Sequence, residues 1–172
     1  MKTRLIIFCA SLVLLSARSV AAQSADPYAA SVSANYDLIY QQQSDVSTVG
    51  AHFDGAWAPK QSLPVFGIVG EFGANHFKNL TVTSAMGGAR ARIPVPDERF
   101  MPFVQMLVGL YHCGPCSEND VALQIGGGVD FRMPSHRMRL RAQVDVRHVF
   151  PAAVGFDGFR LAGGIVMPFH SR

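Results

Sequence analysis

The sequence RMRLRAQVDVRH, residues 137–148, alternates strictly between polar and apolar residues from Arg137 to Arg147. Every second residue from Met138 to Val146 is apolar, and the residues between them are arginine, glutamine or aspartate. Side chains of an extended strand point alternately to opposite faces, whereas those of a helix return to one face every three or four residues. The period of two therefore predicts a β-strand with one apolar and one charged face.

The same period recurs along the rest of the chain, between short clusters of Gly, Pro, Asn, Asp and Ser. The segments with this pattern are 30–41, 47–58, 65–74, 81–93, 100–112, 121–132, 137–148 and 159–169. Alternation is poorest in 100–112, because Phe103 and Leu107 fall on its polar face. An even number of hairpin-linked strands can close into a barrel without an exposed edge. The pattern predicts an all-β fold, an eight-stranded antiparallel up-and-down β-barrel in one domain.

The first residues of the chain have a different pattern. Lys2 and Arg4 precede an apolar run over 5–15, and small residues offer a cleavage site before Gln23. A basic start, a short apolar run and a small-residue site are typical of a secretory signal peptide. The run is about half of the roughly 20 apolar residues that a membrane-spanning helix requires. The predicted organisation is a cleaved signal peptide over 1–22 and a barrel domain over 23–172.

The charge balance of the chain depends on this cleavage. The chain has 15 basic and 12 acidic residues, and Lys2, Arg4 and Arg18 would leave with the signal peptide. The mature protein then carries 12 basic residues against 12 acidic ones. A nucleic-acid-binding surface needs a basic excess or patch. We therefore exclude nucleic acid as a partner.

The cysteines of the mature chain are Cys113 and Cys116, in the sequence HCGPCS. No second Cys-x-x-Cys pair completes a four-ligand zinc site, and no βαβ pattern surrounds this one as in redox domains. A protein exported to an oxidising compartment can form a short local disulfide there. The pattern favours a disulfide between Cys113 and Cys116 over a redox or zinc-binding role.

Alternation alone does not say which face meets water, because a membrane barrel is the reverse of a soluble one. The segments run 10–13 residues, close to the length that crosses a bilayer at a tilt, and their apolar faces carry no charge. Aromatic residues lie near the segment ends, as in interfacial girdles. They are Tyr36, Tyr40, Phe53, Trp57, Phe100, Tyr111, Phe131, Phe159 and Phe169. We expect a transmembrane barrel in the outer membrane of a Gram-negative bacterium, surrounded by outer-membrane lipid.

The polar faces carry charges of both signs. The lumen of eight strands is just wide enough for side chains to fill it. Buried charges require partners, so we predict an ion-pair network that plugs the lumen. Its predicted members are Glu71, Arg90, Arg92, Asp130, Arg132, Arg139, Arg141, Asp145, Arg147 and Arg160, with Asp37 and Asp54 as further acidic partners. For the arginines of 137–148, the nearest predicted carboxylates are Asp130 and Asp145.

A periplasmic N-terminus fixes the expected placement of the connections. Segments 41–46, 75–79, 112–119 and 150–158 are then expected outside the cell. Segments 58–63, 94–99 and 133–136 are expected in the periplasm.

Three stretches resemble a known family. The run LQIGGGVDFR at 123–132, followed by a turn and the charged strand over 139–147, looks like the penultimate hairpin of small eight-stranded outer-membrane barrels, the OmpA-like and opacity-like proteins. The sequence PFVQ at 102–105 resembles the strand before it, and RLAGGIVMPF at 160–169 resembles their C-terminal strand. The resemblance implies that Phe169 is a C-terminal signal, recognised by the outer-membrane assembly machinery.

The sequence shows no pattern of catalytic, cofactor-binding or metal-ligating residues. Its six histidines lack metal-ligand spacing, and GGG at 126–128 is not followed by the lysine of a phosphate loop. His170 and Ser171 are adjacent, which is a poor geometry for one to activate the other. We expect no enzyme activity and a structural or surface-interaction role. The alternatives are a narrow channel for small solutes, a lipid-modifying barrel enzyme using His148 with a loop serine, and a soluble periplasmic barrel that binds an apolar ligand.

Overall fold

The computed structural model describes residues 28–41, 44–58, 66–77, 80–97, 99–114, 118–134, 138–150 and 156–169. The predicted signal peptide over 1–22 lies outside the described residues. No helix in the described part of the chain is long and apolar enough to span a membrane.

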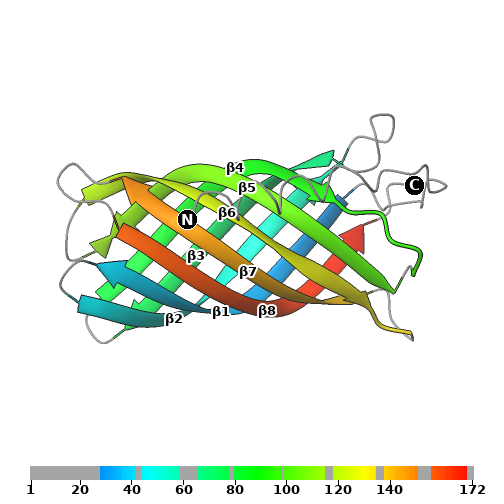
Figure 1. The fold of residues 1–172 in the computed structure, drawn as a ribbon, viewed down its shortest axis with the longest axis horizontal. Helices are drawn as coiled ribbons and strands as arrows, with labels where there is room; N and C mark the ends of the chain where they lie inside the picture. The colour runs from blue at the N-terminus through cyan, green and yellow to red at the C-terminus, as the bar shows by residue number, and fades with distance from the viewer. Residues whose placement is uncertain are drawn as a thin grey trace, which may run out of the picture.

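The described chain forms eight strands that close into a barrel (Figure 1). They are β1 (Tyr28–Gln41), β2 (Ser44–Trp57), β3 (Phe66–Phe77), β4 (Leu80–Arg92), β5 (Phe100–Cys113), β6 (Glu118–Arg132), β7 (Arg139–Phe150) and β8 (Phe156–Phe169). Each strand pairs antiparallel with the next along the chain, and β8 pairs with β1 to close the sheet. The structure confirms the predicted all-β, eight-stranded, antiparallel up-and-down barrel.

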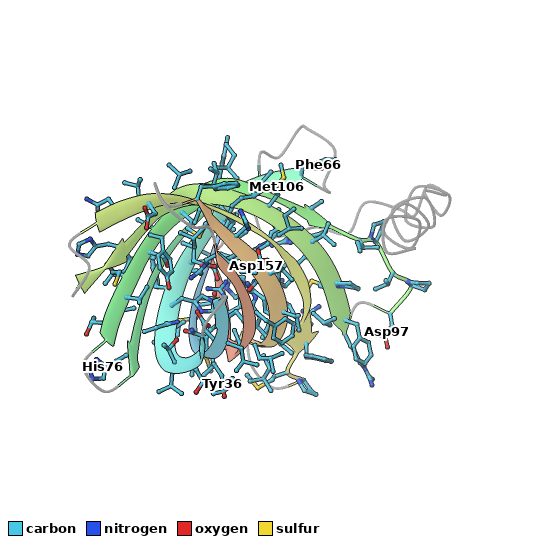
Figure 2. All side chains as sticks on the ribbon, turned by 60° about the vertical axis from the view of Figure 1, so that its left-hand side comes forward. Tyr36, Phe66, His76, Asp97, Met106 and Asp157 are labelled. Atoms are coloured by element: carbon cyan, nitrogen blue, oxygen red, sulfur yellow. The ribbon has the colours of Figure 1, made fainter. Side chains whose placement is uncertain are left out.

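The apolar face of every strand lies on the outside of the barrel. Val49 and Ile68 are 60% and 61% exposed, whereas Asp54 and Asp145 are each 1% exposed. Figure 2 shows Phe66 and Met106 pointing away from the barrel wall. A protein that folds in water buries its apolar side chains, so this arrangement is that of a membrane barrel.

The barrel has two distinct ends. The hairpin end, at the left of Figure 1, holds the connections from β1 to β2, β3 to β4, β5 to β6 and β7 to β8. The termini end holds the other connections, the start of β1 and the end of β8. His76 and Asp97 lie at these opposite ends in Figure 2. Phe100 and Phe131 pack edge to face at the termini end, with ring centroids 5.4 Å apart, as part of an exposed aromatic girdle.

Six of the eight strands are longer than the alternation predicted, whereas β4 and β7 have the predicted length. They run 12–15 residues, and β1 and β2 are joined by residues 42–43 alone, where a loop over 41–46 was predicted. The predicted loops over 75–79, 112–119 and 150–158 are shortened in the same way. Beyond the apolar band both faces of a strand can be polar, so the backbone ladder continues where the period of two ends.

Part of the lumen is filled by apolar side chains from β3 to β7. Its packed residues are Val69, Val82, Met86, Leu107, Tyr111, Ala122 and Val149, with Ala56 against them. The poor alternation of 100–112 therefore has a structural cause, because β5 turns apolar side chains into the barrel. Tyr111 was predicted in the outer girdle, and that prediction is wrong. Tyr111 is an even number of residues from Phe103 and Leu107, so it shares their inner face of β5, where it is 4% exposed.

Candidate functional site: the filled lumen

Polar side chains from all eight strands meet inside the barrel. Toward the termini end, Arg141 on β7 donates to both oxygens of Asp130 on β6, over 2.7 and 2.9 Å. The same guanidinium crosses the lumen to Asp54 on β2, with Nη1 2.8 Å from Oδ2. Arg90 on β4 pairs with the other oxygen of Asp54 at 3.1 Å, and Ser31 on β1 donates to Asp54 as well. Two arginines thus share one carboxylate inside the lumen.

Phe103 contacts both of these arginines. Its ring, buried on the inner face of β5, has the guanidinium of Arg90 at 4.7 Å from its centroid and that of Arg141 at the same distance. A cation is attracted to an aromatic face, and planar guanidinium groups stack on rings more readily than ammonium groups do. An apolar residue on a polar face is therefore a member of the network.

A second group of ion pairs lies nearer the middle of the barrel. Arg160 on β8 donates to both oxygens of Glu71 on β3, over 2.7 and 2.9 Å. Arg160 also lies 2.8 Å from Asp145 on β7. Asp145 accepts from Gln143 at 2.9 Å and from Gln105 at 3.3 Å. Because Gln105 also accepts from Arg90 at 2.7 Å, it joins the two groups into one network.

Arg147 extends this network toward the hairpin end. It donates to Gln124 on β6 over 2.7 and 3.0 Å and lies 3.8 Å from Asp37 on β1 and 3.9 Å from Glu71. Its guanidinium covers the ring of Tyr111, 5.6 Å from the centroid. Beside it, a cavity of about 10 Å³ lies among Asp37, Tyr111, Val149 and their neighbours. A space of this size holds about one water molecule.

Gly126 gives the network room to form. It lies on β6 between Gln105 on β5 and Asp145 on β7 in the strand register. A Cβ atom at this position would collide with Oδ1 of Asp145, the atom to which Gln105 donates. At Gly128, a Cβ atom would come within 2.9 Å of Cζ of Phe103. Gly126 and Gly128 are thus needed for side chains from neighbouring strands to cross the lumen.

The structure brings most of the predicted lumen residues together, though not all of them. Those in the network are Glu71, Arg90, Asp130, Arg141, Asp145, Arg147 and Arg160, with Asp37 and Asp54. Arg92 and Arg139 occupy inward positions of β4 and β7 nearer the termini end. Arg132 is exposed and lies with Asp97 and Arg99 around a hollow of about 400 Å³, because β6 ends at this residue. Its predicted place in the lumen network is therefore wrong.

Sequence reasoning missed the uncharged members of the network. Gln105, Gln124 and Gln143 are at most 3% exposed and connect the charged groups. Nearer the hairpin end, Asn75 donates to Asp37 at 2.5 Å, beside Asn35 and Thr48. All of these residues occupy the inward positions of their strands. The period of two had already placed the three glutamines on the polar faces of their strands, but only charged residues were predicted to form the network.

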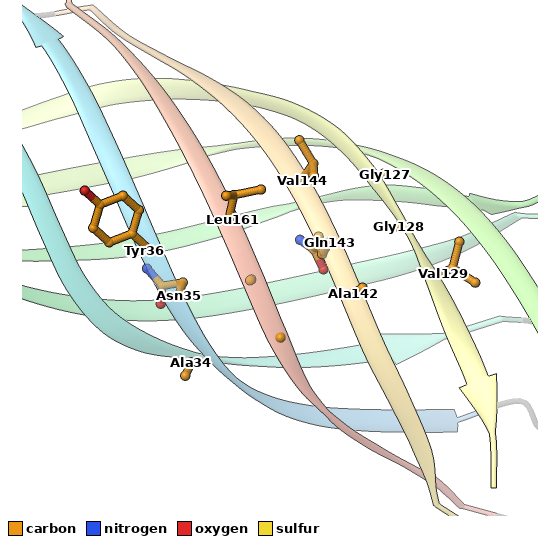
Figure 3. Close-up of a pocket in the computed structure, with 12 residues that line it drawn as sticks. Ala34, Asn35, Tyr36, Gly127, Gly128, Val129, Ala142, Gln143, Val144 and Leu161 are labelled. Carbon is orange, nitrogen blue, oxygen red and sulfur yellow. The ribbon is translucent and has the colours of Figure 1, made fainter.

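The outer wall carries a shallow apolar groove of about 660 Å³, shown in Figure 3. Its floor consists of small residues, and its sides are larger outward-facing ones. The floor is Ala34, Gly127, Ala142 and Gly163, and the sides include Tyr36, Val129, Val144 and Leu161. No charged residue lines the groove, so it forms part of the apolar band.

Histidines lie on the outer wall at the hairpin end. Nδ1 of His148 on β7 lies 2.6 Å from Oδ1 of Asp157 on β8, and the His148 ring packs edge to face on Phe150. Within the described ranges, no three His, Cys, Asp or Glu side chains are grouped so that they could hold a metal ion. Cys113 at the end of β5 is disulfide-bonded, and Cys116 lies outside the described residues.

Comparison with known proteins gives a clear answer for the fold alone. No family model matches the chain, and no curated protein matches its sequence. Among solved structures, Neisserial surface protein A (NspA) superposes with a TM-score of 0.70 at 10% identity, over 86% of this chain and 100% of that one. The outer membrane enzyme PagL superposes with a TM-score of 0.55 at 13% identity, over 81% of this chain and 99% of that one.

A third match is Ail, the attachment invasion locus protein of Yersinia pestis, solved in complex with the heparin analogue sucrose octasulfate. It superposes with a TM-score of 0.52 at 12% identity, over 81% of this chain and 97% of that one. The chain has the fold of small outer-membrane barrels. This agrees with the resemblance found in the sequence. Because the fold carries both surface proteins and an enzyme, the role of this barrel must be argued from its own residues.

Proposed function

We propose that this chain is an outer-membrane barrel with a structural or surface-interaction role and without catalytic activity. One observation carries the proposal, namely that ion pairs cross the lumen and fill it. Arg141 joins β7 to β2, and Arg160 joins β8 to β3, across the barrel. A solute channel requires a continuous water-filled path, and these pairs occupy the place where it would run. Activity is therefore left to the outer wall and the ends of the barrel.

The outer wall supports a location in the outer membrane. Its exposed side chains form a charge-free apolar band bordered by aromatic residues such as Phe100 and Phe131. Such a band is unfavourable in water and favourable in lipid. Export by the signal peptide over 1–22 and assembly through Phe169, the last residue of β8, belong to the same proposal. The mature protein would then begin at Gln23.

The similar structures support a surface-interaction role in particular. NspA is described as a surface protein and Ail as an attachment protein. In this chain the connections at the hairpin end are short, with residues 42–43 and 78–79 joining two of the hairpins. Contacts with a partner would therefore involve the rim of the barrel more than extended loops.

The experiment is expression in a Gram-negative host, followed by separation of the two membranes. We expect the mature protein in the outer-membrane fraction, starting at Gln23. It should run faster on gels before boiling than after it, because small barrels stay folded in detergent until heated. A protein found in the soluble periplasmic fraction, with one gel mobility throughout, would support a soluble ligand-binding barrel instead.

One observation favours a second candidate, a lipid-modifying enzyme. His148 and Asp157 form a hydrogen-bonded pair on the outer wall, and such a pair can orient a general base. The test is to incubate the purified barrel with outer-membrane lipid and analyse the lipid by mass spectrometry. Our proposal expects unchanged lipid. Cleavage products that vanish in His148→Gln would make the enzyme the correct interpretation.

A further inference from the structure

Arginines gather at the termini end of the barrel. Arg92 and Arg132 end β4 and β6, Arg139 begins β7, and Arg99 directly precedes β5. Arg99 and Arg132 are exposed, whereas Arg139 is buried. A guanidinium group stays charged at every physiological pH. The positive charge at this end therefore does not depend on titration.

Two of these arginines lie around a hollow of about 400 Å³. Its lining residues are Asp97, Arg99, Arg132 and Pro134, and we call it the arginine hollow. The backbone N–H of Arg132 donates to the carbonyl oxygen of Arg99 over 2.8 Å, which ties the end of β6 to the connection before β5. Both guanidinium groups therefore start from backbone positions that are fixed relative to each other. The volume falls within the roughly 300–1,000 Å³ of small-molecule sites.

Asp97, which Figure 2 shows at this end of the barrel, holds the turn beside the hollow. Its carboxylate accepts from the backbone N–H of Arg99 over 2.9 Å, and its carbonyl oxygen accepts from the backbone N–H of Phe100 over 3.1 Å. Within the part of the chain that the structure describes, no ion pair joins this carboxylate to Arg99 or Arg132. Asp97 therefore stabilises the turn before β5 without bridging the two guanidinium groups.

The charges of the surrounding connections leave this end basic. Among the described residues here, four arginines stand against one exposed carboxylate, that of Asp97. Asp130 belongs to the lumen network, where both of its oxygens accept from Arg141. Glu98 and Arg137 belong to the same connections but lie outside the described residues, and their opposite charges cancel. The excess of positive charge therefore holds whether or not these two residues are counted.

An aromatic pair fixes the level of the hollow along the barrel. Phe100 follows Arg99, Phe131 precedes Arg132, and the two exposed rings pack edge to face. Aromatic residues of membrane barrels lie at the boundary between hydrocarbon and headgroups. If the apolar band lies in a bilayer, as the proposed function requires, the arginine hollow lies at the level of the lipid phosphates. With the termini in the periplasm, these belong to the periplasmic leaflet.

The outer wall next to the aromatic pair has room for a hydrocarbon chain. Val129, the next outward residue of β6 after Phe131, lines the apolar groove of Figure 3, whose floor continues through Ala142 and Gly163. A soluble anion would match the arginine hollow alone. A phospholipid matches both features, because it carries a phosphate group and acyl chains in one molecule. The combination favours a lipid as the ligand.

We propose that Arg99 and Arg132 bind the phosphate group of an anionic phospholipid in the periplasmic leaflet, and that one of its acyl chains lies in the apolar groove. The inference rests on the proposed function, because it needs the apolar band to lie in a bilayer. Guanidinium groups bind phosphate oxygens through paired, charge-assisted hydrogen bonds. Since arginine does not titrate in this range, binding is the same from about pH 5.5 to about pH 8.

The test measures lipid binding to the folded, full barrel in detergent by native mass spectrometry. Phosphatidylglycerol and phosphatidylcholine are titrated separately, and the Kd of the first bound lipid is compared. One cation at a membrane surface favours anionic lipid by a factor of about five. We therefore expect phosphatidylglycerol to bind at least about fivefold more tightly than phosphatidylcholine. The double variant Arg99→Gln, Arg132→Gln should lose this preference.

A matched control compares one cation at each end of the barrel. Arg132→Gln should weaken phosphatidylglycerol binding about fivefold, whereas Lys78→Gln, in the connection between β3 and β4, should leave it unchanged. Ala142→Leu fills the floor of the groove without changing charge, so it should weaken the binding of both lipids alike. Glycerol phosphate, which carries the phosphate without acyl chains, should compete far less well than phosphatidylglycerol.

The opposite outcomes separate the proposals. Equal binding of the two lipids by folded wild-type protein, or a preference that survives in the double variant, would overturn the arginine site. Competition by glycerol phosphate as strong as that by the lipid, or unchanged binding in Ala142→Leu, would mean that a soluble anion is the ligand. Heat-dependent gel mobility verifies that each variant is folded. A wild-type protein that does not fold in detergent would instead contradict the proposed function.

Discussion

Arg141 illustrates the energetics of a single charged residue inside a closed barrel. Its side chain is 2% exposed, and its guanidinium contacts Asp54, Asp130 and the ring of Phe103. Removing a charge from water is costly, and an ion pair repays that cost only when the geometry is good and the remaining donors are satisfied. Arg141 meets this condition through two carboxylates on opposite sides of the lumen. Removing one partner of such a pair is therefore expected to be costly, because it leaves the other charge buried without compensation.

The first prediction concerns Arg160. Arg160→Met should destabilise the barrel by about 3–5 kcal/mol, because Glu71 and Asp145 lose their shared cation while they stay buried. Adding Glu71→Met should recover part of that loss by removing one of the uncompensated charges. Urea unfolding in liposomes, followed by gel mobility, measures both changes. The control is Arg132→Met, at the exposed end of β6, which should change the unfolding free energy by less than about 1 kcal/mol.

A double variant less stable than Arg160→Met alone would show that the Glu71 carboxylate still has a compensating cation when Arg160 is absent. A loss from Arg132→Met as large as that from Arg160→Met would show that burial in the lumen is not the cause.

The second prediction compares two glycines. Gly126→Ala should cost about 1–3 kcal/mol, because the new methyl group overlaps Asp145 and breaks its contact with Gln105. Gly163→Ala should be neutral or slightly stabilising, since its nearest contact is an ordinary 3.9 Å to the carbonyl oxygen of Arg141. The same urea unfolding assay compares them. Equal stability of the two variants would mean that the lumen is loosely packed at Gly126.

For single residues, the sequence predicted which charged side chains face the lumen better than it predicted which of them pair with each other. The face of Arg90 or Asp145 follows from counting residues along one strand. The choice of partner depends on the stagger of the strands around the barrel, which places Arg160 opposite Glu71 on β3. Local alternation carries no information about that stagger, so Arg141 could be matched with neighbouring Asp130 but not with distant Asp54.

Strand β7 shows how one element serves two environments. Its residues alternate without exception between buried and at least partly exposed, from Arg139 to Phe150. The inward side chains build the network, and the outward ones build the apolar band. This separation explains why 137–148 predicted a strand so clearly. On β5 the alternation of apolar and polar residues is weaker, because Phe103, Leu107 and Tyr111 are apolar residues on the inner face.

The third prediction tests the two faces of β7. Val144→Arg places a charge on the outer wall and should reduce membrane insertion, at a cost of about 2–4 kcal/mol at the middle of a bilayer. Gln143→Arg places the same side chain in the lumen beside Asp145, where it has a carboxylate partner, and should be milder. The measured quantity is the fraction folded into vesicles of matched thickness. Equal tolerance at positions 143 and 144 would mean that the apolar wall does not face lipid.

The ends of the elements were the least predictable part of the fold. The connections between β1 and β2 and between β3 and β4 are shorter than predicted because the ladder continues past the apolar band. There, residues such as Thr81 and Asn119 take outward positions that apolar side chains hold nearer the middle of the wall.

At the scale of the whole molecule, the network connects strands that the sheet itself keeps apart. Hydrogen bonds of the ladder join only neighbours, such as β7 with β8. The ion pairs add cross-lumen contacts from β7 to β2 and from β8 to β3. An eight-stranded barrel leaves space for side chains and little more. Polar pairs and the apolar cluster around Leu107 together fill that space.

The fourth prediction is that the purified barrel gives no stable conductance in planar bilayers. A path through the lumen would have to pass the cross-lumen pairs of Arg141 with Asp54 and Arg160 with Glu71, and opening it would leave buried charges without partners. The cavity beside Arg147 has room for about one water molecule, too little for a continuous file of water. The variant Arg141→Ala, Arg160→Ala removes both crossing side chains and provides the comparison. If it folds, it should show brief, irregular current steps that the wild-type protein lacks. Reproducible single-channel steps from wild-type protein, abolished by boiling, would mean that the network opens and that the barrel is a narrow channel.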